Sequence, residues 1–295
     1  MAGVGDGMAG GRDRGAAGRE GLAAGRTGGA AGRCRDPYDM EAMTGEEAQA
    51  RLRETGIALL PLGAVEIHGP HLPLGTDNYI ARAMARKVAE RVDAVVLPTL
   101  AYGQVWSLYG FPGTLSVDDR ALAGVLVGIG RSLRDLGVPI FAIVNAHLGN
   151  VAAMREAARV LESEGGPLTF YFTHPALGEA AERVRESPRF HGSLFHACEL
   201  ETSMMLYLAP EHVEMSRAVR EIPQVPPDFD FRPVRWRELT RTGVMGDPTL
   251  ATPEKGRVLV EASVDRMVAI LAEARRRVRA GGGAGEGADA VEKKG

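Results

Sequence analysis

Four short, largely apolar runs most constrain what this chain of 295 residues can fold into. They cover residues 57–62, 94–97, 139–144 and 168–172. Stretches with apolar residues at helical spacing lie between them. Strands that are apolar throughout, rather than at every second position, are typical of a parallel sheet covered by helices on both faces. The sequence therefore predicts an α/β fold with three layers, α/β/α, around a mainly parallel sheet.

Helices are expected over residues 79–91, 122–136 and 152–161, where apolar side chains recur every three or four positions. A further helix is expected to begin at residues 252–254, where Thr suits the N-cap and Pro the first turn. Its apolar positions continue to Leu271 as one stripe, which predicts a helix with one buried face.

The two ends of the chain differ from its middle. Residues 1–36 and 281–295 are rich in Gly and Ala and offer little to bury, so they cannot offset the entropy lost on ordering. We expect both to be disordered tails around one domain of residues 37–280. A transit peptide is the alternative for the first tail, but acidic residues interrupt it and no apolar face forms.

The overall composition excludes several functional classes. With 35 basic and 38 acidic residues the net charge is −3, so no basic excess indicates nucleic-acid binding. No apolar run approaches the roughly 20 residues that span a bilayer. The two cysteines, Cys34 and Cys198, cannot form a disulfide framework and fit a reducing compartment. We therefore expect a soluble, cytoplasmic, globular protein with neither nucleic acid nor membrane as a partner.

Chemically useful side chains follow the predicted strands. Glu66 and His68 come after the first strand and project to the same side of an extended segment. A glycine before Asp77 can turn that carboxylate back toward the pair. His147 follows the strand at 139–144. Ligands of open α/β sheets bind at the carboxyl ends of strands, so we expect these side chains to meet there.

Carboxylates and imidazoles together suit Zn²⁺, Mn²⁺ or Fe²⁺ better than Mg²⁺ or Ca²⁺. A lone His after a strand is more often an ordinary hydrogen-bonding loop residue. The case for a metal site rests on coincidence, since four of the seven His fall in three such loops: His68, His71, His147 and His196. On spacing alone, both interpretations stay open.

At these positions the sequence resembles the creatininase (creatinine amidohydrolase) family, over roughly residues 55–272. The matching segments occur in family order. They are residues 66–77, Phe111-Pro112-Gly113-Thr114, Asn145-x-His147-x-Gly149-Asn150, residues 196–203 and Gly246-Asp247-Pro248. The resemblance implies an α/β/α metal-dependent hydrolase that cleaves cyclic or linear amide C–N bonds with a metal-activated water.

The resemblance further implies two divalent metal ions, with zinc expected and manganese or iron as alternatives. Asp77 would bridge the ions, Glu66 and His147 would hold one of them, and His68 would hold the other. Creatininase completes the second ion with a Glu at the position occupied here by Gly149.

For that missing carboxylate we infer Glu199 as the substitute, with Glu201 as its rival. If the apolar residues at 200, 204, 207 and 208 mark a helical stripe, the two carboxylates point in different directions. Only one of them can then be a ligand.

The departing nitrogen of an amide needs a proton, and His196 is the expected general acid because an imidazole titrates in the right range. His71 is expected as a supporting residue or site wall, Asn150 and Asp247 as supporting residues, and His174 as a weaker pocket candidate. Residues 104–110 predict an apolar, aromatic wall, and Cys198 is expected to be a small buried hydrophobe.

Two other functions stay open at this point. One is a hydrolase that opens a non-amide ring, as an inosose-type cyclic ketone would require, and the other is a metal-binding pseudoenzyme. The family resemblance also implies a small-molecule substrate and a closed homo-oligomer, commonly a hexamer.

Overall fold

The computed structural model describes residues 36–192 and 195–282, which fall within one compact unit. The expected tails at 1–36 and 281–295 lie almost wholly outside these residues, so their disorder stays a prediction. Helix α7 (Pro253–Gly282) extends two residues into the expected C-terminal tail. Within the described part of the chain, no helix is both long and apolar enough to cross a membrane.

The described strands form one parallel, four-stranded sheet, as the apolar runs predict. Its strands are β1 (Ile57–Leu62), β2 (Val95–Val96), β3 (Ile140–Asn145) and β4 (Leu168–Thr173). The order across the sheet is β2-β1-β3-β4, and every pairing is parallel. Since β1 and β3 are neighbours in register, their carboxyl ends lie side by side, with Leu62 opposite Asn145.

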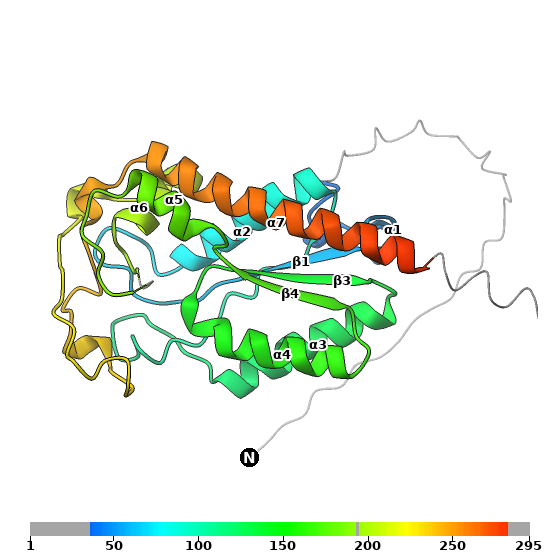
Figure 1. Ribbon diagram of the computed structural model, residues 1–295, viewed down its shortest axis with the longest axis horizontal. Coiled ribbons are helices and arrows are strands. Elements are labelled where there is room, and N and C mark those ends of the chain that lie inside the picture. Colours follow the sequence, from blue (N-terminus) through cyan, green and yellow to red (C-terminus); the bar gives the residue numbers. More distant parts are fainter. Residues whose placement is uncertain (1–35, 193–194, 283–295) are drawn as a thin grey trace, which may run out of the picture. The chain divides into compact units, whose positions relative to one another are not determined.

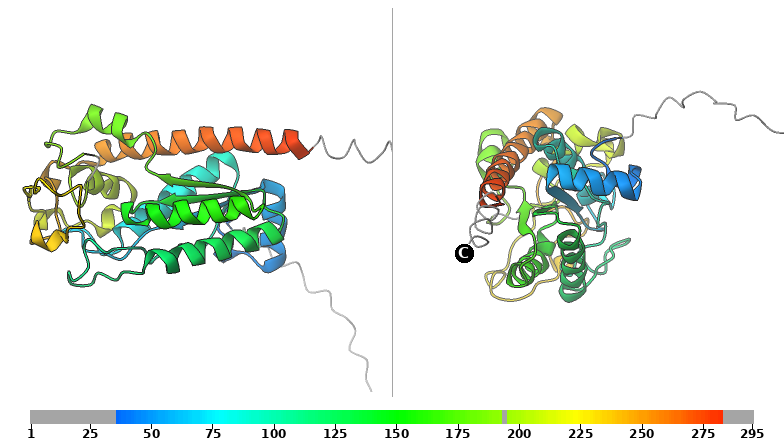
Figure 2. Two further views of the ribbon diagram at one scale, coloured as in Figure 1. Left: turned by 60° about the horizontal axis from the view of Figure 1, so that its bottom comes forward. Right: turned by 90° about the vertical axis from the view of Figure 1, so that its right-hand side faces the viewer.

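Helices cover both faces of this sheet and make the predicted three layers (Figure 1). One face carries α2 (Thr76–Val92), α5 (Leu177–Val184), α6 (Glu199–Leu208) and α7. The other face carries α3 (Asp119–Asp135) and α4 (Val151–Ser163), and α1 (Gly45–Thr55) adds Leu52 to that core. The end-on view in Figure 2 separates the two helical layers.

The pleat of β1 sends successive side chains to opposite cores. Ile57 and Leu59 pack toward α2 and α7, whereas Ala58, Leu60 and Leu62 pack toward α3 and α4. Every residue of β1 and β3 is therefore buried, which explains why both read as unbroken apolar runs.

Short 3-10 turns connect the larger elements. They are η1 (Met40–Ala42), η2 (Leu148–Asn150), η3 (Pro210–His212), η4 (Met215–Arg217), η5 (Trp236–Glu238) and η6 (Pro248–Leu250). The predicted helices correspond to α2, α3, α4 and α7. No sequence pattern predicted α1 or α5. Helix α6 corresponds to the apolar residues at 200, 204, 207 and 208, which the sequence offered only as a possible helical stripe.

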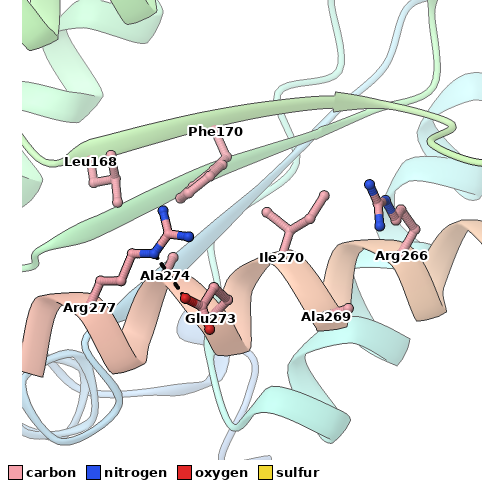
Figure 3. Close-up of a pocket in the computed structure, with 8 residues that line it drawn as sticks. All are labelled: Leu168, Phe170, Arg266, Ala269, Ile270, Glu273, Ala274 and Arg277. Carbon is pink, nitrogen blue, oxygen red and sulfur yellow. Dashed lines mark hydrogen bonds and ion pairs between the residues drawn. The ribbon is translucent and has the colours of Figure 1, made fainter.

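Strand β4 forms one edge of the sheet and leaves a groove against α7. Figure 3 shows Leu168 and Phe170 of β4 facing Ile270 and Ala274 of α7, beside the ion pair of Glu273 and Arg277. The groove, about 450 Å³ in volume, contains none of the candidate site residues. The candidate site residues lie instead at the carboxyl ends of the strands.

The close packing of α6 on α7 depends on Gly256. A Cβ atom at this position would lie 1.9 Å from the carbonyl oxygen of Ser203 and 2.9 Å from the Cβ of Tyr207. Since Ser203 is backbone of α6, the two helices could not keep this spacing with a side chain there. The contact also places the neighbouring Lys255 of α7 against the start of α6.

We expect Gly256→Ala to lower the free energy of unfolding by about 1–3 kcal/mol, the usual cost of overpacking a tight interior. Gly124→Ala is the matched control, because Gly124 lies exposed in α3 and a methyl group there would meet nothing within 4 Å. That control should be neutral or more stable by up to about 1 kcal/mol, from helix propensity. Urea unfolding of both variants makes the comparison, and equal stability would contradict the close contact.

Candidate metal centre

A buried cluster of carboxylates and imidazoles lies at the carboxyl ends of β1 and β3. Among the described residues, three overlapping groups of side chains have donor atoms within 4.8 Å of one another. They comprise Glu66, His68, Asp77, His147, His196 and Glu201. All six side chains are buried. Five of them are residues that the sequence predicts for the site, as ligands or as the general acid. The sixth, Glu201, is the carboxylate that the sequence offers as the alternative to Glu199.

The loop after β1 is held by its own backbone and by the Phe-Pro-Gly-Thr segment. The N–H of Glu66 donates to the carbonyl of Leu74 at 3.0 Å, which folds the loop back toward α2. The N–H of Ile67, the residue between the two ligand candidates, donates to Oγ1 of Thr114 at 3.1 Å. Asp77 then enters the cluster from the first turn of α2.

The side chain of Asn150 joins the ends of the two central strands. Its Nδ2 donates to the carbonyl of Gly63 after β1 at 3.0 Å and to Oδ1 of Asn145 at 2.9 Å. Asn145 ends β3 and donates to the carbonyl of His147 at 2.6 Å. This network fixes His147 relative to Glu66, which supports the role expected for Asn150.

Each imidazole of the cluster is oriented by a backbone carbonyl. Nδ1 of His68 lies 3.1 Å from the carbonyl of Glu66. Nε2 of His147 lies 2.7 Å from that of Gln104, and Nε2 of His196 lies 2.7 Å from that of Ile67. Because a carbonyl only accepts, these ring nitrogens carry the hydrogen. The other nitrogen of each ring faces the carboxylates, the arrangement usual for metal-binding His.

Asp77 lies between two His side chains. Its Oδ2 is 3.4 Å from Nδ1 of His147, and its Oδ1 is 3.6 Å from Nε2 of His68. Glu66 Oε1 lies 3.1 Å from Nδ1 of His147, while Glu201 Oε2 lies 3.4 Å from Nε2 of His68. Two of the three groups thus share the carboxylate of Asp77, and the third, formed by Glu66, His68 and His196, overlaps both of them.

Three buried atoms of the cluster have no hydrogen-bond partner among the described residues: Glu66 Oε2, His68 Nε2 and Asp77 Oδ2. Buried polar atoms are normally bonded, because an unsatisfied one costs about 1–3 kcal/mol. Mixed carboxylate and imidazole donors suit zinc, manganese or iron. The residues present therefore fit divalent metal ions.

The charges of the cluster are strongly coupled. Burial opposes ionisation of Glu201, yet the adjacent His68 and His196 hold its pKa at about 2. Burial likewise opposes the charge of His147, but Glu66 and Asp77 raise its pKa to about 9. Burial, and the negative charge of Glu66, raise the pKa of Asp77 to about 6. The buried carboxylates thus require positive charge beside them.

The structure does not bring Glu199, the predicted fifth ligand, to the cluster, so that prediction needs correcting. Its carboxylate accepts from Nζ of Lys255 at 2.5 Å and from the backbone N–H of Ser187 at 2.8 Å. These bonds lower the pKa of Glu199 although burial opposes ionisation. Both carboxylates lie in the first turn of α6, and the helix turns them in different directions. Glu201 is the one that faces His68.

The structure also explains why no carboxylate can occupy position 149. A Cβ atom on Gly149 would lie 2.2 Å from the carbonyl of Gln104 and 2.4 Å from Nε2 of His147. A side chain there would displace the bond that orients His147. Glu201 supplies a carboxylate from α6 instead.

The cluster opens into a cavity of about 240 Å³. Its other walls are formed by Ser107, Ala146, Leu148, Gly149, Phe195 and Trp236. The ring of Trp236 meets His196 edge-on, with centroids 5.4 Å apart. Ser107 comes from the segment predicted to form an apolar, aromatic wall, but that segment's Trp106 and Tyr109 are exposed beside Arg235 and do not line the cavity. The aromatic walls are Phe195 and Trp236, which no sequence pattern indicated.

The remaining candidates lie outside the cluster. His71 pairs with Oγ1 of Thr202 at 2.8 Å, and burial lowers its pKa to about 4, consistent with a supporting role. Asp247 caps the turn η6. Burial raises the pKa of Cys198 to about 11, so its thiol behaves as the expected small hydrophobe. Cys34 lies outside the described residues.

The fold and the cluster together define an α/β protein with a centre suited to divalent metals. The creatininase (creatinine amidohydrolase) family model matches residues 41–271. A mycofactocin precursor peptide peptidase of Mycobacterium tuberculosis is 35% identical over 76% of this chain and 88% of its own. The creatinine amidohydrolase of Pseudomonas putida is 29% identical over 78% of this chain and 95% of its own.

Solved structures agree with the sequence comparisons. One described as "Creatininase Mn" has a TM-score of 0.70 and 27% identity, and covers 80% of this chain and 98% of its own. A mutant creatininase has also been solved in a Zn–Zn form. The chain belongs to the creatininase family of hydrolases, which confirms the predicted family and fold.

We expect Glu201→Gln to reduce the bound metal from about two ions toward one per chain, because the neutral amide loses the charge that faces His68. Glu199→Gln is the matched control on the same helical turn. It should keep the metal and lower the free energy of unfolding by about 1–3 kcal/mol through the lost pairing with Lys255. Elemental analysis and thermal unfolding separate the two effects. Loss of metal in Glu199→Gln with retention in Glu201→Gln would reverse our assignment.

Proposed function

We propose that this protein is a metal-dependent hydrolase that cleaves an amide C–N bond with a metal-activated water. The observation that carries this proposal is the shared carboxylate of Asp77, which lies between a Glu66–His147 group and a His68–Glu201 group. A carboxylate can bridge two cations, whereas a neutral imidazole that donates one N–H to a carbonyl has only one nitrogen left to bind a cation.

In this proposal Glu66 and His147 would hold one ion, His68 and Glu201 would hold the other, and Asp77 would serve both. Zinc is the expected metal, with manganese or iron as alternatives. When bound, the two ions supply a water whose pKa is lowered toward neutrality. The carbonyl contacts of the three imidazoles keep their free nitrogens turned toward the carboxylates, so the donor set is oriented before any metal arrives.

His196 is the residue we propose for proton transfer. Its Nε2 is committed to the carbonyl of Ile67, and its Nδ1 lies 3.5 Å from Glu66 Oε1 at the cavity. Burial and the neighbouring His68 lower its pKa, which favours the neutral ring and leaves Nδ1 without a hydrogen. We propose that it takes up the proton released by the attacking water and returns it to the departing nitrogen. The ring of Trp236 packs against the imidazole in a T-shaped contact.

The relatives support an amide as the bond that is cleaved. One is named a peptidase and another a creatinine amidohydrolase, and both names denote hydrolysis of a C–N bond. Another relative is named 3-dehydro-scyllo-inosose hydrolase, from Thermotoga maritima. For this reason the test also includes the ring-opening alternative. A cavity of about 240 Å³ suits a small substrate or one end of a longer one. Assembly as a closed oligomer and a cytoplasmic location stay predictions.

The metal-loaded protein should hydrolyse at least one class among creatinine, lactams, formamides and short peptides, and a chelator should abolish that activity. His196→Asn should keep its metal and lose about 10²- to 10⁴-fold in turnover, the usual contribution of a positioned acid or base. Product analysis by mass spectrometry and metal content by elemental analysis provide the readouts.

Three outcomes would contradict the proposal in different ways. Loss of metal in His196→Asn would make His196 a ligand, and His174 would be the next candidate for proton transfer. Turnover of cyclic ketones alone would favour the ring-opening reaction. Full metal occupancy with no turnover of any substrate would favour the pseudoenzyme.

A further inference from the structure

A second cavity lies next to the metal-site cavity and shares two side chains with it. Leu148 and Phe195 line both spaces. The second cavity measures about 430 Å³ and lies between the end of β4, helix α5 and the segment that follows α5. A molecule that reaches past Leu148 and Phe195 would therefore have one part at the metal site and another in this cavity.

The walls of the second cavity are mainly apolar, but they include three charged residues. Leu177, Ala181 and Leu200 belong to the apolar part. Glu182 and Arg189 form an ion pair with each other, so their charges compensate. The third charged residue, Arg185, has no ion-pair partner among the described residues, and it stands between this cavity and a smaller one bordered by Cys198.

The guanidinium of Arg185 makes no hydrogen bond or ion pair with any residue in the described ranges. Its Nε is buried and lacks a partner. An unsatisfied buried donor is costly, more so when the group is charged. The planar fork of Arg matches a carboxylate, which can accept two parallel hydrogen bonds from it. An anionic group in the cavity would satisfy this side chain.

His174 adds an unused acceptor to the same cavity. Its Nε2 lies 3.3 Å from the carbonyl of Ala146, so that nitrogen is the donor. Burial lowers the pKa of His174, which keeps the ring neutral, and the buried Nδ1 has no partner in the described part of the chain. The residue also has a φ of 45°, a conformation that non-glycine residues seldom adopt. The cavity wall thus contains one cationic and one neutral side chain, each with a buried nitrogen that lacks a partner among the described residues.

We propose that this cavity binds the free carboxylate of the substrate, so that the enzyme acts on amides whose amine part is an amino acid or a short peptide end. Arg185 binds the carboxylate, Nδ1 of His174 accepts a nearby amide N–H, and the apolar walls hold a hydrophobic side chain. The scissile amide lies across Leu148 and Phe195 at the metal site. The position of the scissile bond in this proposal rests on the proposed function. The binding of the carboxylate does not.

Calorimetric titration of the metal-loaded full chain tests the proposal without requiring turnover. The probes are N-acetyl-leucine and N-acetyl-glycyl-leucine, each compared with its C-terminal carboxamide. For at least one length, the acid should bind about 10- to 100-fold more tightly, which is the range for a hydrogen bond to a charged group. Arg185→Gln should remove this advantage, and Arg185→Lys should keep part of it.

Arg183→Gln is the matched control, because Arg183 is exposed on the last turn of α5 and does not line the cavity. It should retain the full preference for the acid. Metal content and thermal unfolding, measured for every variant, identify a folding defect. Equal binding of acid and carboxamide by the wild-type protein would overturn the proposal. A preference that survives in Arg185→Gln would also overturn it, since the carboxylate would then bind elsewhere, for instance at the metals.

The proposed function and this proposal fail separately. If the acid probes bind through Arg185 but no amide is hydrolysed, the cavity is a carboxylate site and the proposed amide hydrolysis is wrong. If amides are hydrolysed with no preference for a free carboxylate, the reverse is true.

Discussion

The burial of three carboxylates within a few ångströms of one another is the constraint on which the rest of the site depends. Glu66, Asp77 and Glu201 are each at most 3% exposed. Buried charges of one sign are stable only beside opposite charges or metal ions. The imidazoles of His68, His147 and His196 surround them, and each is tied to a backbone carbonyl. The protein therefore keeps a concentrated negative centre whose shape is set by the main chain.

The parallel sheet supplies the rigid frame for this centre. Strands β1 and β3 end side by side, so the loops that follow them emerge at one edge of the sheet. The amide of Asn150 fastens these loops to each other. On the opposite side of the cluster, Lys255 of α7 fixes the start of α6 through Glu199, and Gly256 allows the two helices to approach. Glu199 thus stabilises the helix that presents Glu201, which gives it a structural role in place of the predicted ligand role.

Much of this arrangement could be predicted from the sequence. The unbroken apolar runs identified β1 and β3 as buried and the sheet as parallel, whereas β4 is a partly exposed edge strand. Position after a strand predicted that Glu66, His68, Asp77 and His147 would meet, and they do. The choice between Glu199 and Glu201 could not be made in the same way. It depends on where α6 begins and on Lys255, a partner 56 residues away in the chain. Trp236 and Phe195 reach the cavity from irregular segments, and no periodic pattern marks such positions.

A crystal structure of the metal-loaded protein, with anomalous scattering recorded at the metal absorption edges, tests the central claim most directly. We predict two metal peaks per chain, with the carboxylate of Asp77 between them. Glu66 and His147 should coordinate one ion, His68 and Glu201 the other, while Glu199 stays paired with Lys255. A single ion, or a second ion bound by Glu199 with Glu201 turned away, would contradict the account.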